Sequence, residues 1–350
     1  MTQPILYSRV SAKIGAERGK LLSEAKLKTL MESKNLSELA TQLRDTSYQE
    51  QIIKVSLPFT SRKLERAFHE NLISTYVKII ENSPKNASEY LRLYLLRFEV
   101  ENIKTLIKAT NAELSLDQKI NRVYLSAEDY LKNRSVIEET AKAPDIKQIV
   151  KALKKTDYTP ALNMGLQSYE EDGTTNCLDV LLDKTFYEKL HDSYETLPKK
   201  EKPHAYFYAS IEIDSFTLLT LLRGKNLNYD ANWLRLTVPP NNFYLGMETV
   251  EAMITATDFE SALKIALDSH YAGFFAKAQS PAEIIANAEK AFKKAVFQHA
   301  KASIVPEHFN IGVPLAFLTQ KEAEVYNLTA LSSCKEASIK PDDLQLQLLL

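Results

Sequence analysis

Pairs of carboxylates are the clearest candidates for chemistry in this sequence. Glu99 lies two residues before Glu101, and Glu322 lies two residues before Glu324. Two carboxylates that converge on one substrate can act as general acid and general base. On a helix, however, residues two apart point to different sides. The spacing therefore argues against an acid–base pair, and we predict no catalytic residue in this chain.

The helix that carries Glu99 also has a polar stripe of alternating charge. Arg97, Glu101, Lys104 and Lys108 recur at i, i+4, i+7 and i+11, so their side chains follow one side of a helix. This pattern is typical of a solvated or salt-bridged helix face.

The stretch IGAERGKLL, residues 14–22, resembles a phosphate-binding loop. The Walker A motif requires four residues between its glycines and a Ser or Thr after its lysine. Here three residues separate Gly15 from Gly19, and Leu21 follows Lys20. The stretch is also predicted to be continuous helix. We therefore expect no nucleotide or other cofactor site.

Metal and thiol chemistry have equally little support. The histidines form neither an i, i+4 pair nor the HExxH pattern of zinc enzymes. They are His69, His191, His204, His270, His299 and His308. The two cysteines, Cys177 and Cys334, are too few for a disulfide framework, which favours a reducing cytoplasm. No metal site is predicted.

The composition predicts a soluble intracellular protein. Of 350 residues, 45% are hydrophobic, 25% are charged and only 8 are glycine, which disfavours tight β-hairpins and favours helices. The formal net charge is −1, so the overall charge does not attract nucleic acid. No apolar run approaches the roughly 20 residues that span a bilayer.

Apolar residues recur at helical spacing along most of the chain, whereas period-two strand patterns are almost absent. The clearest helices are predicted over residues 21–31, 62–81 and 89–109, where apolar positions lie three and four apart. Stretches rich in helix-breaking residues, such as ENSPKNASE at 81–89, separate the helices. The predicted fold class is therefore all-α.

Three segments of the chain repeat one pattern. Residues 25–48, 135–158 and 248–271 each read as a helix, a short break and a second helix that ends in a polar pair and a tyrosine. These tyrosines are Tyr48, Tyr158 and Tyr271, about 110 residues apart. The stretches NRVYLS (121–126) and NNFYLG (241–246) precede the second and third segments.

A second shared motif follows each segment. When Asn102, Thr217 and Asn327 are aligned, an acid lies three residues earlier each time, namely Glu99, Asp214 and Glu324. We expect this acid to pair with a basic group or to cap a neighbouring helix. The period is longer than the 20–50 residues of solenoid repeats. We therefore predict three homologous helical domains, at residues 1–115, 116–232 and 233–350, arranged with pseudo-threefold symmetry as a funnel or ring.

The N-terminal stretch adds a family resemblance. Residues 7–48 contain a tyrosine, two spaced basic residues, a Leu-Leu pair before a helix and a closing Asp-Thr-x-Tyr. This stretch is similar to the start of the C subunits of archaeal A-type and bacterial V/A-type ATP synthases, which correspond to the d-type subunits of vacuolar ATPases. Residues 98–109, 212–227 and 312–336 resemble helices of that family in the same order.

The resemblance implies a non-catalytic central-stalk rotor subunit. Members of this family form a helical funnel on the cytoplasmic face of the membrane, with one copy per complex. The funnel receives the central axle, formed by the D and F subunits, and couples it to the membrane proteolipid ring during ATP-driven or ion-driven rotation. Transport of protons or sodium ions belongs to other subunits. A peripheral location and the lack of any cofactor are thereby implied.

Other functions remain open on the sequence alone. The threefold pattern also permits an all-helical scaffold or adaptor of another cytoplasmic assembly. A prenyl-type helical enzyme would show paired DDxxD motifs for magnesium, and only Asp342-Asp343 comes near that pattern. The final LQLQLLL is too short to cross a membrane, and Leu348 to Leu350 are interpreted as end-packing or a contact point.

Overall fold

The computed structural model describes residues 3–303, 309–339 and 348–349, and every regular element within these ranges is helical. The all-α prediction is confirmed. The chain divides into two compact units: unit 1 is Met1–Leu91 with Lys294–Leu350, and unit 2 is Arg92–Lys293. Both boundaries fall inside long helices, α6 (Lys85–Asn111) and α17 (Pro281–Ser303).

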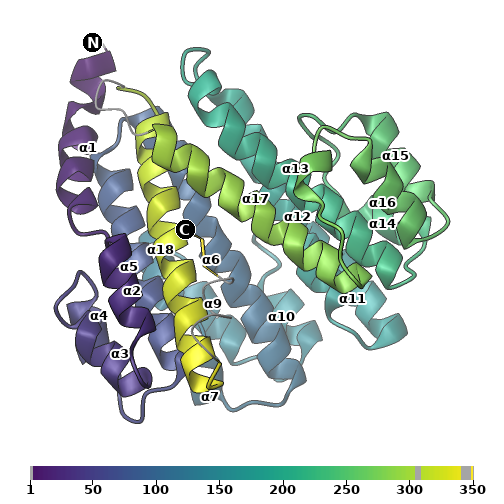
Figure 1. Ribbon diagram of the computed structural model, residues 1–350. Coiled ribbons are helices and arrows are strands. Elements are labelled where there is room, and N and C mark those ends of the chain that lie inside the picture. The colour runs from purple at the N-terminus through teal and green to yellow at the C-terminus, as the bar shows by residue number, and fades with distance from the viewer. Residues whose placement is uncertain (1–2, 304–308, 340–347, 350) are drawn as a thin grey trace. The chain divides into compact units, whose positions relative to one another are not determined.

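Unit 1 is organised around two long helices that are far apart in the sequence. The last long helix of the chain, α18 (Gly312–Glu336), packs along α5 (Ser61–Asn82), and α1 (Gln3–Arg18) contacts both (Figure 1). Shorter helices complete this unit: α2 (Glu24–Met31), α3 (Leu36–Leu43) and α4 (Gln49–Ile53). Because α18 is buried along most of its length, with Phe317 and Leu328 almost fully inaccessible, the two ends of the chain share one core.

Unit 2 contains the rest of α6 and α17 and the helices between them. These are α7 (Leu116–Ile120), α8 (Leu125–Leu131), α9 (Arg134–Ala141), α10 (Ile146–Ala152), α11 (Thr159–Asp172), α12 (Asn176–Thr196), α13 (Lys202–Asn226), α14 (Ala231–Thr237), α15 (Met247–Thr255) and α16 (Phe259–Leu267), followed by the 3₁₀ turn η1 (Ala272–Phe274). Helix α12 packs against α11 and α13, and α13 also contacts α16.

The three repeated segments have the same local structure. In each, an Asn or Asp side chain caps the second short helix by accepting the backbone N–H three residues later. The caps are Asn35, Asp145 and Asp258, at 3.0, 2.8 and 2.8 Å from the N–H groups of Glu38, Gln148 and Ser261. Each cap lies thirteen residues before the tyrosine that ends its segment. The repetition therefore extends to the hydrogen bonds that begin these helices.

The end of the second helix is also the same in each segment. A Ser or Thr hydroxyl two residues before the tyrosine donates to the carbonyl three residues earlier. Thr46, Thr156 and Ser269 make this bond at 2.6, 2.7 and 2.6 Å. This turn ends the helix and sets the backbone that carries each tyrosine.

One local prediction is wrong. Residues 14–22 do not form a continuous helix, because α1 ends at Arg18 and α2 begins at Glu24. The hydroxyl oxygen of Ser23 accepts the N–H of Lys26 at 3.1 Å and starts the second helix. Gly19 lies in the turn between them, where its low helix propensity is no disadvantage. None of the helices described is long and apolar enough to cross a membrane.

Close packing of α11 on α12 depends on Gly165. A Cβ atom there would lie 2.6 Å from Leu178 Cδ2 and 2.9 Å from Leu178 Cα. We expect Gly165→Ala to lower the free energy of unfolding by about 1–3 kcal/mol, because the helices must move apart. Gly15→Ala is the matched control, since nothing lies within 4 Å of its added Cβ, and it should stabilise α1 by about 0.5–1 kcal/mol. Urea denaturation measures both, and a stabilising Gly165→Ala would contradict the close approach.

Candidate functional site

The repeated acids and the repeated tyrosines are hydrogen-bond partners. In unit 1, the Tyr48 hydroxyl donates to Glu324 Oε1 at 2.7 Å. The other carboxylate oxygen, Glu324 Oε2, accepts the backbone N–H of Leu22, in the loop before α2. The side chains of Tyr48 and Glu324 are both buried. Their hydrogen bond joins the start of the chain to its last long helix.

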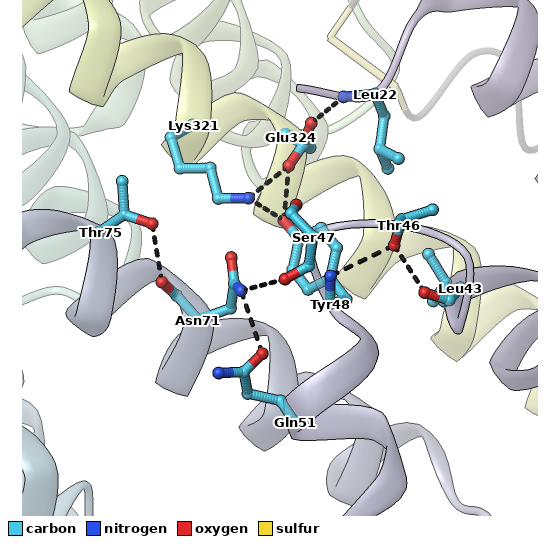
Figure 2. A network of polar contacts seen from close by, with 10 residues as sticks. All are labelled: Leu22, Leu43, Thr46, Ser47, Tyr48, Gln51, Asn71, Thr75, Lys321 and Glu324. Carbon is cyan, nitrogen blue, oxygen red and sulfur yellow. Dashed lines mark hydrogen bonds and ion pairs between the residues drawn. The ribbon is translucent and has the colours of Figure 1, made fainter. Parts of the chain in front are cut away.

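A buried lysine completes the polar cluster of unit 1. The Lys321 ammonium donates to Glu324 Oε1 at 2.6 Å and to the Tyr48 oxygen at 2.9 Å, and it lies 4.1 Å from the centre of the tyrosine ring. Figure 2 shows these three side chains converging between α18 and the segment that precedes α4. Burial lowers the pKa of Lys321, and the neighbouring Glu324 opposes that shift. Such a cation balances the charge of the buried carboxylate.

Unit 2 contains two further pairs of the same kind. The Tyr158 hydroxyl donates to Glu99 Oε2 at 2.8 Å, and the Asn133 amide donates to Glu99 Oε1 at 2.5 Å. The Tyr271 hydroxyl donates to Asp214 Oδ2 at 2.8 Å. Each acid therefore bonds to the tyrosine of the next repeated segment, and the last acid bonds to the first tyrosine.

Asp214 has the most backbone partners of the three acids. Its carboxylate accepts the N–H groups of Phe243, Tyr244 and Leu245 at 2.8, 2.7 and 3.3 Å, in the NNFYLG stretch that precedes α15. Burial raises the pKa of Asp214, against the effect of these backbone donors and of Tyr271. Burial, followed by the charge of the partner acid, likewise raises the pKa of all three tyrosines. The phenols are therefore neutral donors.

Asn102 and Asn327 make matching contacts with backbone. The Asn102 amide donates to the carbonyl of Tyr124 at 3.2 Å and accepts the N–H of Tyr124 at 2.7 Å. Asn327 makes the same reciprocal pair with Leu349, at 3.0 and 2.7 Å. Thr217, at the aligned position, donates to the Asn242 side chain at 2.7 Å. Leu349 thus takes the place in unit 1 that NRVYLS and NNFYLG take in unit 2.

Sequence reasoning identified the positions but missed these partners. No copy of the NRVYLS stretch precedes the first repeated segment, and that gap was the available signal that another part of the chain fills its place. Leu348 and Leu349, both buried, lie there. Leu348 and Leu349 therefore pack in the core of unit 1, which is one of the two roles expected for them.

Three lysines provide a further repeated contact that sequence reasoning did not find. Each donates to carbonyls at the C-terminal end of the first short helix of a repeated segment, a position that favours a cation. Lys119 bonds to Ala143 O at 2.8 Å, Lys225 bonds to Ile254 O at 2.7 Å, and Lys335 bonds to Met31 O. Burial lowers the pKa of Lys119 and Lys225.

Glu128 is a second buried acid close to the Glu99 pair. Its Oε1 accepts the Asn102 amide at 2.7 Å, its Oε2 has no hydrogen-bond partner, and its side chain is fully buried. Burial raises its pKa to about 8, and the charges of Glu99 and Asp129 add to the shift. The carboxyl group is therefore protonated at neutral pH.

The polar stripe on α6 is salt-bridged, as the sequence predicted. Arg97 bonds to Glu212 on α13, whereas Lys104 bonds to Asp183 at 3.0 Å and Lys108 bonds to Asp179 at 2.7 Å, both on α12. The stripe therefore holds helices of unit 2 together.

The acids of each candidate catalytic pair lie in different environments. Glu99 is buried whereas Glu101 is half exposed, and Glu324 is buried whereas Glu322 is only partly so. Lys20, at the end of the loop that resembles Walker A, bonds to Glu17 at 2.8 Å. The two acids of each pair therefore do not face one common environment.

Cysteine and histidine positions add no reactive cluster. Cys177 and Cys334 are both buried and free, and burial raises the pKa of each thiol. Within residues 3–303, 309–339 and 348–349, no group of three or more His, Cys, Asp or Glu side chains could hold a metal ion. His308 and Asp342-Asp343 lie outside the described residues.

Comparison with known proteins gives one consistent match. The sequence pattern of the family described as ATP synthase (C/AC39) subunit matches residues 10–346. The C subunit of the A-type ATP synthase of Methanocaldococcus jannaschii is 28% identical over 343 residues, which cover 97% of this chain and 85% of the relative. Its counterparts from Methanothermobacter thermautotrophicus and Thermococcus kodakarensis are 24% and 26% identical, and the matches cover 99% and 96% of this chain and 89% and 88% of the relatives.

We expect Glu99→Ala to loosen unit 2, because it leaves the buried Tyr158 hydroxyl and the partly buried Asn133 amide without their acceptor. The loss in the free energy of unfolding should be about 2–3 kcal/mol, measured by urea denaturation. Glu101→Ala, on the same helix but half exposed, is the control and should change stability by less than about 0.5 kcal/mol. Equal stabilities of the two variants would contradict the structural role of Glu99.

Glu128 should make unfolding depend on pH. Because its pKa is raised from 4.5 to about 8 in the folded chain, the folded state binds more protons than the unfolded state between these values. The contribution of Glu128 to the free energy of unfolding is therefore fully present below pH 4.5 and is lost as pH rises through 8. The slope of this loss is at most about 1.4 kcal/mol per pH unit. Stability curves of Glu128→Gln and the unchanged chain should diverge over this window. Parallel curves would rule the effect out.

Removal of Leu348 to Leu350 should destabilise unit 1. The deletion leaves both hydrogen-bonding groups of the buried Asn327 amide unsatisfied and exposes the apolar surface that the tail covers, at a cost of about 2–4 kcal/mol. Hydrogen exchange of α18 amides reports the loss locally. Leu349→Ala keeps the backbone bonds and should lose less. A truncated chain with unchanged exchange in α18 would show that the tail does not stabilise this unit.

Proposed function

This chain belongs to the ATP synthase (C/AC39) subunit family, and we propose that it is a non-catalytic central-stalk rotor subunit of an A-type ATP synthase. In this role one copy per complex receives the axle formed by the D and F subunits. It transmits rotation to the membrane proteolipid ring, from the cytoplasmic face and without crossing the bilayer. ATP hydrolysis or synthesis and ion transfer belong to other subunits.

The observation that carries the proposal is the family match over nearly the whole chain. The matched relatives are named as C subunits of A-type ATP synthases, and each alignment covers most of both proteins. A match of this extent supports the same role for this chain in an A-type ATP synthase.

The structure supports a mechanical role in physical terms. A part that transmits torque must resist deformation, and closely packed helices are resistant because a packed interior has low compressibility. Helices α6 and α18 have 27 and 25 residues, or about 40 Å of length each at 1.5 Å per residue. The buried tyrosine–acid pairs fix helices in each unit. The recurring acids thereby hold helices together, as expected for a subunit without a catalytic role.

We further propose that the repeats correspond to three domains arranged as a pseudo-threefold funnel. The supporting observation is that cap, turn, tyrosine, acid and lysine recur three times with matching hydrogen bonds. The proposed boundaries lie at residues 115 and 232, and the acid of each copy bonds to the tyrosine of the next. A division just before each acid-bearing helix would keep each pair in one domain.

Reconstitution tests the rotor proposal directly. The purified chain is mixed with a D–F pair and a detergent-solubilised proteolipid ring and then sedimented. We expect all components in one complex, because the chain contacts axle and ring at the same time. The control omits the chain, and the D–F pair should then not cosediment with the ring.

Two outcomes would contradict the proposal. A chain that cosediments with neither partner would favour a scaffold role in another assembly. ATP hydrolysis that stays fully coupled to ion pumping after the chain is removed would show that it does not transmit rotation.

A further inference from the structure

Unit 1 contains a polar cavity beside the Tyr48–Glu324 pair. Its volume is about 300 Å³, and it lies where the loop after α1, the segment before α4, and helices α5 and α18 meet. The polar side chains that line it include Lys20, Ser47, Asn71, Lys78 and Lys321. Liquid water occupies about 30 Å³ per molecule, so the cavity can hold a small ion together with several waters.

The acids near the cavity are already paired. Glu17 bonds to Lys20 at 2.8 Å, Glu50 bonds to Lys54 at 2.7 Å, and Glu324 bonds to Lys321 at 2.6 Å. These carboxylates therefore have little charge left to repel an anion in the cavity.

Among the described residues that line the cavity, Lys78 is the lysine whose ammonium group is not paired with a carboxylate. It has no ion pair within 4.0 Å. Its charge nevertheless acts on this region, because the hydrogen bond from Lys20 and the charge of Lys78 lower the pKa of Glu17 against the effect of burial. The cavity therefore has positive charge that no protein group neutralises directly.

Two buried polar atoms at the cavity have no hydrogen-bond partner. They are Asn71 Oδ1, on a side chain that is 8% exposed, and Ser47 Oγ. The Asn71 amide nitrogen is occupied, since it donates to Ser47 O at 2.7 Å and to Gln51 Oε1 at 3.1 Å. Figure 2 shows the Asn71 amide oxygen on the side of the Lys321 amine. An unsatisfied buried acceptor costs about 1–3 kcal/mol, so a ligand that donates to it is favoured.

The chemistry of the lining is therefore mixed. Lysine ammonium groups and the Ser47 hydroxyl offer donors to anionic oxygens, whereas Asn71 Oδ1 and the paired acids accept hydrogen bonds. A ligand that fits must carry negative charge and also present an O–H group. Phosphate at neutral pH has both properties, whereas sulfate is a fully deprotonated anion of the same shape.

We propose that this cavity in unit 1 binds inorganic phosphate in a protonated form, with Lys78 and Lys321 facing its charged oxygens and Asn71 Oδ1 accepting from its P–OH group. The inference is independent of the rotor proposal, because it concerns the isolated chain.

The test compares phosphate with sulfate on the isolated full-length chain. Isothermal titration is carried out with each anion at constant ionic strength set by chloride. We expect saturable phosphate binding and sulfate binding about tenfold weaker or more, because a site that accepts a ligand O–H discriminates against an analogue without it. Lys78→Gln should weaken phosphate binding about fivefold, through loss of one charge-assisted contact.

Lys85→Gln is the matched control. Lys85 is also a lysine of unit 1, but its side chain is 86% exposed and it does not line the cavity, so this variant should keep its affinity for phosphate. Thermal unfolding in chloride alone shows that both variants are folded. Because Lys78 is also exposed at the surface, its substitution preserves the core.

Three results would overturn the proposal. Unsaturable heats would mean that the cavity holds water only. Equal affinities for phosphate and sulfate would show that Asn71 Oδ1 does not accept a hydrogen bond from the ligand. Equal losses in Lys78→Gln and Lys85→Gln would indicate screening of surface charge rather than a site.

Discussion

A buried carboxylate that accepts a tyrosine hydroxyl is the interaction on which this structure depends. Taking an ionised acid out of water is costly unless its oxygens are hydrogen-bonded. Each of the three acids therefore requires donors at fixed positions, and each finds one in a tyrosine that is remote in the sequence. In unit 1 this requirement ties Tyr48 to Glu324. The two ends of the chain then belong to one core, which α5 and α18 build together.

The three repeated acids all need hydrogen-bond donors, but apart from the tyrosine their donors differ. Glu324 is balanced by the buried cation of Lys321, Asp214 is held by successive backbone N–H groups, and Glu99 receives the Asn133 amide. The tyrosine alone is common to all. One hydrogen bond is therefore common to the three repeated segments, whereas the other partners of each acid differ.

This arrangement gives the buried acids of the repeats a structural role. Glu99 and Glu324, which first resembled catalytic groups, have both carboxylate oxygens hydrogen-bonded to protein donors. The two thiols are buried, and burial raises their pKa values. Cohesion of helices therefore accounts for the most unusual polar residues of the chain. The cavity beside Lys321 is a different case, because Asn71 and Ser47 retain unsatisfied atoms there.

The sequence by itself determined the all-α class, the repeated tyrosines and acids, and the family, because helical periodicity and repetition are local patterns along the chain. It also placed Arg97, Lys104 and Lys108 on one helix face, solvated or salt-bridged. It misjudged residues 14–22, where α1 ends at Arg18 and the Ser23 side chain caps the next helix. Only the tertiary structure decided which tyrosine meets which acid, that Leu349 fills the missing loop position, and that Glu128 stays protonated. Those outcomes depend on which groups pack together, and hydrogen bonds in this chain join residues up to 304 positions apart, a distance over which sequence spacing carries no signal.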